Sequence, residues 1–97
     1  MALACKLTTP ELQERKRTVI QTLKGLVIGR TETPSGFNYQ FNGSDETLDL
    51  LNSFIKTERL CCDFFNFRLT VTSDGLAEME LSGPQGTKEF IVSELGF

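Results

Sequence analysis

Phe37-Asn38-Tyr39-Gln40-Phe41 alternates apolar and polar side chains without a break. Neighbouring side chains of an extended chain point to opposite sides, so this pattern predicts a strand with one buried face. Residues 65–71 and residues 77–81 alternate in the same way. Three half-buried strands in so short a chain predict an antiparallel sheet that is covered on one side by helices.

The segments around these strands predict two hairpins. Residues 26–31 are rich in β-branched side chains, and the turn signal Thr-Pro-Ser-Gly at 33–36 joins them to the strand at 37–41. Ser73-Asp74-Gly75 joins the other two strands, and its glycine suits a turn position with positive φ. We therefore expect four strands in two hairpins.

Helix signals lie before, between and after the hairpins. Thr8 or Thr9 followed by Pro-Glu starts a helix that ends near Lys24, and Gly25 stops it. The Gly-Ser-Asp at 43–45 caps a second helix over residues 45–62.

A third helix is expected to open at residues 83–85 and to run to about Glu94, with Phe90, Ile91 and Leu95 turned inward. The predicted order is α-β-β-α-β-β-α, an α+β fold in one domain of residues 1–97. A hairpin followed by a helix then occurs twice, and the strand at 37–41 matches the strand at 77–81 at an offset of 40 residues. An internal repeat explains this match, and so does coincident turn chemistry.

Composition excludes several classes of function. The net charge is −3 and the basic residues form no concentrated face, so we expect no nucleic-acid partner. The apolar runs, such as residues 26–28, are far shorter than a membrane span, and the first residues carry no secretory signal, so we expect a cytoplasmic protein without a membrane span. The chain has no histidine, which excludes Ser/His and Cys/His catalysis and favours a non-enzymatic role.

The chemistry-bearing residues gather at the end of the second predicted helix. Cys61 and Cys62 are adjacent, and Glu58 lies one turn earlier on the apolar stripe of that helix. A carboxylate on a core-facing stripe is costly unless it is paired or bound to an ion. One interpretation is therefore a structural ion pair, with a partner among Arg15, Arg30 and Arg68. The other makes Glu58 a proton acceptor or co-ligand beside the thiols.

Three interpretations of the cysteines remain open. They are packed as small hydrophobic side chains, they bind a soft metal or metalloid ion, or they carry redox or nucleophilic chemistry. Cys5 could add a third thiolate, which would suit mercury(II), arsenic(III), or zinc completed by Glu58 or water. Arg59 or Arg68 would lower the thiol pKa. The C-terminal end of a helix disfavours a thiolate, which places redox chemistry last.

Phe64 offers an alternative role. It points away from its strand neighbours Phe65 and Phe67, so an exposed Phe64 would mark a contact with a partner. The chain would then be a protein-interaction or structural module with buried cysteines.

The chain resembles a family of small bacterial proteins that share a Glu-Arg-x-Cys-Cys-x-Phe block and have no assigned activity. The resemblance is carried by Cys5, Leu7-Thr8, Glu11-Leu12, Arg15, Glu58-Arg59, Cys61-Cys62, Phe64, Phe67, Leu69, Gly83-Pro84, Gly86 and Lys88-Glu89-Phe90. Relatives often have proline after the cysteine pair, where this chain has Asp63. The resemblance implies that Cys5, Glu58, Arg59, Cys61 and Cys62 belong to one site, but it implies no substrate. The leading hypothesis is a small thiol protein that binds a soft metal or metalloid ion.

Overall fold

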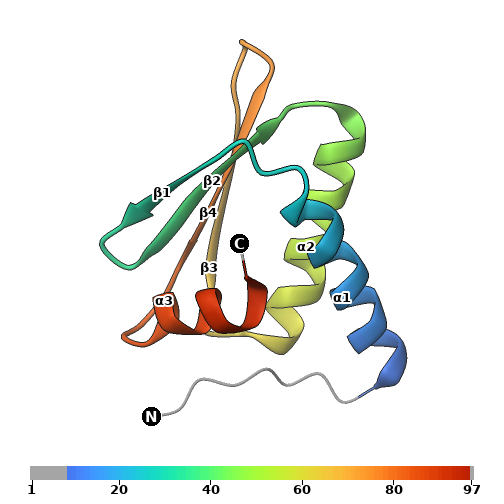
Figure 1. Ribbon diagram of the computed structural model, residues 1–97, viewed down its shortest axis with the longest axis vertical. Helices are drawn as coiled ribbons and strands as arrows, with labels where there is room; N and C mark the ends of the chain where they lie inside the picture. Colours follow the sequence, from blue (N-terminus) through green and yellow to red (C-terminus); the bar gives the residue numbers. More distant parts are fainter. Residues whose placement is uncertain (1–8, 97) are drawn as a thin grey trace.

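The computed structural model describes residues 9–96 of the 97-residue chain, apart from the side chain of Cys61. It confirms the predicted α-β-β-α-β-β-α order (Figure 1). The elements are α1 (Pro10–Lys24), β1 (Gly29–Thr33), β2 (Gly36–Asn42), α2 (Asp45–Cys61), β3 (Asn66–Val71), β4 (Leu76–Ser82), α3 (Thr87–Phe90) and the π-helical turn η1 (Ile91–Leu95). No helix in this described part is long and apolar enough to cross a membrane.

The four strands form one antiparallel sheet in the order β1-β2-β4-β3. The inner strand of each hairpin pairs with the inner strand of the other, and Tyr39 lies opposite Met79 at the centre. A two-fold rotation between these two residues would place each residue of β2 on the residue 40 positions later in β4. The 40-residue offset of the predicted repeat is therefore also the local two-fold symmetry of the two inner strands.

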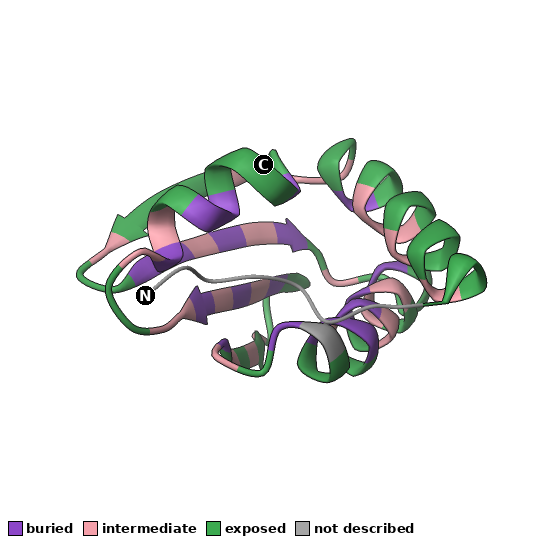
Figure 2. Ribbon diagram, turned by 90° about the horizontal axis from the view of Figure 1, so that it is seen from below, coloured by how far each residue is buried: buried purple, intermediate pink, exposed green. Residues whose placement is uncertain are grey.

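One face of the sheet carries the core. The inward-facing residues of the two inner strands are at most 5% exposed, and buried and half-buried positions alternate along these strands (Figure 2). They are Phe37, Tyr39, Phe41, Ala77, Met79 and Leu81. The ring of Phe54 on α2 lies 6.4 Å from that of Phe67 on β3, and the ring of Phe90 on α3 lies 5.8 Å from that of Phe65. Two helices thus cover the same apolar face.

Helix α1 packs along α2 (Figure 1). Its predicted start is confirmed, because Pro10 is its first residue and the Thr9 hydroxyl accepts a hydrogen bond from the backbone of Leu12 at 3.4 Å. The predicted cap of α2 is also confirmed, since the Ser44 hydroxyl accepts from the backbone N–H of Thr47 at 3.3 Å. Helix α2 ends at Cys61, and Cys62 is its C-cap with φ −120° and ψ 70°.

Two predicted boundaries were wrong. The first strand is Gly29–Thr33 rather than residues 26–31, because the pairing of Thr33 with Gly36 fixes its register and residues 26–27 pack against the core instead. The third helix begins at Thr87 rather than at residue 83. The Thr87 hydroxyl donates to the carbonyl oxygen of Pro84 at 2.6 Å, and Gly86 has φ +99°, so a turn occupies the predicted first turn of the helix.

Candidate thiol site

A buried polar cluster lies where α1 packs against the end of α2. The ammonium nitrogen of Lys16 lies 3.4 Å from Oε1 of Glu58 and donates to Sγ of Cys62 at 4.0 Å. Lys16 belongs to α1, Glu58 lies in the last turn of α2, and Cys62 caps that helix. We call Lys16, Glu58 and Cys62 the thiol cluster.

The thiol cluster is enclosed. Glu58 and Cys62 are 0% exposed, and the side chain of Lys16 is 14% exposed. Helix geometry places Glu58 and Cys62 on one side, because they are four residues apart and the Cys62 N–H donates to the Glu58 carbonyl oxygen at 2.6 Å. A lysine stem can cross apolar surface while its ammonium reaches a polar partner, which is how α1 supplies the cation.

The ion pair of Glu58 was predicted with the wrong partner. Arg15 is exposed, and Arg30 stacks over the ring of Phe37 at 4.7 Å. Arg68 lies 3.8 Å from Glu80, on the sheet face opposite the core. The cation beside Glu58 is Lys16.

A signal for Lys16 is present in the sequence. Leu12, Lys16, Val19 and Leu23 are spaced by four, three and four residues, so Lys16 interrupts the apolar stripe of α1. Glu58 interrupts the stripe of α2 in the same way. Opposite charges on the packing faces of two helices predict that the faces meet at those charges.

Two opposing electrostatic influences act on a thiolate at Cys62. The C-terminal end of α2 is the negative pole of the helix and disfavours a thiolate there. The ammonium of Lys16 favours a thiolate, as nearby lysine or arginine does at reactive cysteines. Because Lys16 and Glu58 neutralise each other, the thiol cluster carries no net charge while Cys62 is protonated.

The other predicted site residues are dispersed. Arg59 is exposed on the surface of α2. Phe64 is half-buried, with its ring 4.7 Å from that of Phe65 and 5.1 Å from that of Phe90. The structure thus joins Glu58 with Cys62 and leaves Arg68 apart from them.

Two predicted ligands lie outside the described atoms, namely Cys5 and the side chain of Cys61. Within residues 9–96, the Cys61 side chain excepted, no group of three or more cysteine, aspartate or glutamate side chains is placed to hold a metal ion. The described donors that could serve an ion are the sulfur of Cys62 and the carboxylate of Glu58. One soft and one hard ligand do not by themselves form a closed site.

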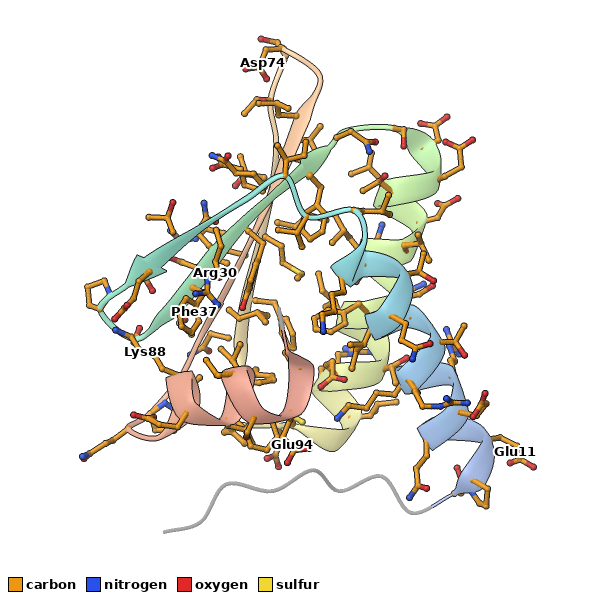
Figure 3. All side chains as sticks on the ribbon, viewed as in Figure 1. Glu11, Arg30, Phe37, Asp74, Lys88 and Glu94 are labelled. Carbon is orange, nitrogen blue, oxygen red and sulfur yellow. The ribbon has the colours of Figure 1, made fainter. Side chains whose placement is uncertain are left out.

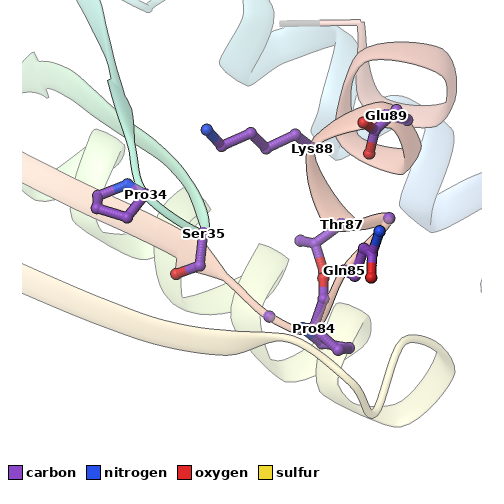
Figure 4. Close-up of a pocket in the computed structure, with 9 residues that line it drawn as sticks. Pro34, Ser35, Pro84, Gln85, Thr87, Lys88 and Glu89 are labelled. Atoms are coloured by element: carbon purple, nitrogen blue, oxygen red, sulfur yellow. The ribbon is translucent and has the colours of Figure 1, made fainter.

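Shallow depressions elsewhere on the described surface are lined by polar groups that already hydrogen-bond within the protein. One of about 300 Å³ lies between the turn at residues 34–35 and the loop before α3, where the Thr87 hydroxyl is turned to Pro84 (Figure 4). Another of about 390 Å³ lies between β1 and α3, where Lys88 donates to Glu32 at 2.6 Å beside Phe37 (Figure 3). That hydrogen bond lowers the pKa of the Glu32 carboxyl below its ordinary value.

The open face of the sheet is polar. Its depression of about 250 Å³ is lined by Asn38, Arg68, Thr70, Glu78 and Glu80. The amide of Asn38 donates to Glu78 at 2.9 Å, so these groups bond to one another across the strands. Polar and charged side chains therefore line this face of the sheet.

No protein family, curated protein or solved structure matches this chain. The resemblance to the family with the Glu-Arg-x-Cys-Cys-x-Phe block therefore stays a prediction. The function has to be argued from the thiol cluster and its surroundings.

Proposed function

We propose that the protein binds a soft metal or metalloid ion in the cytoplasm, with Cys62 as the anchoring ligand. The observation that carries this proposal is the contact of the Lys16 ammonium with both the sulfur of Cys62 and the carboxylate of Glu58. An ion-binding thiol has to lose its proton, and a neighbouring ammonium lowers the free energy of the thiolate.

Stability alone does not account for this cluster. Burying an ion pair requires both charges to lose their water, and packed hydrophobic side chains of similar volume often stabilise a fold as well or better. Glu58 and Cys62 occupy fully buried positions on an otherwise apolar stripe. A charged pair buried beside Cys62, where hydrocarbon would serve folding as well, therefore supports a chemical role for the sulfur.

The two remaining thiols are those of Cys61 and Cys5. Cys61 is the last residue of α2 and directly precedes Cys62. Cys5 is four residues from Thr9, a reach of at most about 14 Å, and Lys16 lies about 10 Å along the helix from that same point. The chain before α1 is thus long enough to return Cys5 to the thiol cluster, and three thiolates suit soft ions.

Titration of the reduced protein with arsenite, zinc, copper(I) and mercury(II) tests the proposal. We expect at least one ion to bind tightly to the wild type and weakly to the Cys61→Ser/Cys62→Ser variant. Thr57→Ser is the matched control, because Thr57 is a buried polar residue on the same helix and offers no thiol. Wild-type affinities no higher than those of the cysteine variant would end the proposal.

The enclosure of Cys62 favours a second function, a protein-interaction or structural module with packed cysteines. Free cysteine is among the most buried residue types, and a thiol without access to solvent reacts with nothing. This function predicts that a thiol reagent leaves Cys62 unmodified in the folded protein and that no ion binds. Modification of Cys62 in the folded state at the rate of an exposed thiol would exclude it.

A further inference from the structure

Strand β1 forms one edge of the sheet. It pairs with β2 on one side, and within residues 9–96 no strand pairs with its other side (Figure 1). The backbone N–H and C=O groups along such an edge can pair with a further strand. Its three central residues, Arg30, Thr31 and Glu32, are exposed, so a second chain can approach this edge.

The sequence of β1 is complementary to itself in charge. When a second copy of β1 lies antiparallel across a two-fold axis at Thr31, Arg30 of each copy faces Glu32 of the other. Both side chains lie on the helix-covered face of the sheet, because they are opposite Tyr39 and Phe37 in the register with β2. Opposite charges directly across two strands stabilise their pairing, and this register forms two such pairs at once.

Both charged groups can make this contact. The guanidinium of Arg30 lies 4.7 Å from the centre of the Phe37 ring, and no carboxylate of the described residues forms an ion pair with it (Figure 3). Glu32 accepts from Lys88 through Oε2, and its Oε1 accepts no hydrogen bond from the described residues. The depression beside them also contains Glu89, so two carboxylates there face one ammonium. An incoming guanidinium balances the remaining negative charge.

The same register brings exposed apolar side chains together at both ends of the paired strands. Ile28 precedes β1 and is 61% exposed. The position that faces it across the two-fold axis is Pro34 of the other copy, which is exposed in the turn after β1. Apolar surface is thereby removed from water twice in each pair of chains.

The other edge of the sheet lacks this complementarity. Strand β3 carries a single charged residue, Arg68, so no register of β3 against a second β3 places a carboxylate opposite it. Self-pairing is therefore favoured at β1 and not at β3.

We propose that two copies of this protein associate through their β1 edges, antiparallel and centred on Thr31. The two four-stranded sheets then continue across the two-fold axis as one sheet of eight strands. Each copy contributes a strand of five residues, which is less than a standard interface, so the dimer is weak and depends on protein concentration. This inference is independent of the thiol cluster.

Sedimentation equilibrium of the reduced protein at low salt and rising concentration tests the proposal. We expect wild type to shift from monomer toward dimer. Arg30→Glu and Glu32→Arg each place like charges in both cross-strand pairs, so either variant alone should weaken association about tenfold or more. In an equimolar mixture of the two variants, each glutamate faces an arginine. The mixture should therefore associate within about threefold of wild type, although neither variant does so alone.

Two control variants separate this contact from other effects. Arg68→Glu makes the same charge change on β3 and should leave association within about twofold of wild type. Lys88→Met removes the hydrogen bond that Glu32→Arg also removes, and it should leave the dimer intact. A wild type that stays monomeric at every concentration would overturn the proposal. So would a mixture that does not associate, or a loss in Arg68→Glu as large as in Arg30→Glu.

Discussion

Two regions of this protein are equally buried and chemically opposite. At the centre of the sheet, Tyr39, Phe41 and Met79 are 0% exposed and surround themselves with other core side chains. At the junction of α1 and α2, Glu58 and Cys62 are also 0% exposed; Cys62 belongs to the same core cluster, but both residues lie beside an ammonium. Folding requires the first region, because buried apolar area is its main driving force. The Lys16–Glu58 pair adds no comparable driving force, because both charges lose their water on burial, and this difference is the reason to propose function there.

The largest effect is expected in the apolar region. Phe41→Ala removes a fully buried ring and leaves a cavity beneath the helices, which should lower the free energy of unfolding by about 3–5 kcal/mol. Urea unfolding followed by circular dichroism measures it. Ile28→Ala is the control, because Ile28 is 61% exposed and should change stability by only about 0.5 kcal/mol. Similar losses in both variants would show that Phe41 is not part of the core.

The second effect separates the thiol cluster from the core. Lys16→Met leaves the Glu58 carboxylate buried without its cation and should cost about 3 kcal/mol, whereas Lys16→Met/Glu58→Leu should come close to the wild type or exceed it. A double-mutant cycle of urea unfolding measures the coupling.

The matched control for this cycle lies on the same helix. Glu14 and Arg17 form an ion pair of 2.7 Å in which both side chains are more than half exposed. Water and salt screen that pair, so its removal should change stability far less than the loss of Lys16 alone. If the double variant Lys16→Met/Glu58→Leu is as unstable as Lys16→Met, the cluster is needed for folding and the contrast between the two regions fails.

The smallest expected effect is a loss of folding stability at alkaline pH that comes from Tyr39 in the core. Burial raises the pKa of Tyr39 to about 12, against the opposing influence of Arg30. Since the unfolded phenol titrates near 10, it loses its proton first, so the stability contributed by Tyr39 is complete below about pH 10 and is lost as pH rises toward 12. We expect wild type to lose about 1–2 kcal/mol more than Tyr39→Phe between pH 9 and pH 11.5. Parallel pH profiles of the two proteins would contradict the assignment.

The sequence predicts the sheet well because its signals are local. Strict alternation at residues 37–41 and 77–81 fixes which side chains face inward, and Ser44 marks the start of α2. The bounds of β1 and the start of α3 were predicted wrongly. The pairing of Thr33 with Gly36 sets the end of β1, and a turn hydrogen bond and a left-handed glycine set the start of α3. Periodicity alone does not reveal such backbone details.

Only the part of the candidate site that lies on α2 was predicted from the sequence. Helical spacing placed Glu58 and Cys62 on the same buried side, and the structure has them there. The identity of the cation depended on how α1 and α2 pack, which the spacing within α2 does not show. Lys16 was overlooked because it lies between Arg15 and Arg17, and such a basic cluster on a helix is usually a solvated face.

The most direct test of the account is the ligand shell of arsenic in the reduced protein loaded with arsenite. X-ray absorption at the arsenic edge counts the sulfur atoms bound to the metalloid. The account predicts a shell containing sulfur in the wild type, with one sulfur fewer for each arsenic in Cys62→Ser. A shell made of oxygen alone, or a sulfur count that Cys62→Ser leaves unchanged, would contradict the assignment of Cys62 as the anchoring ligand.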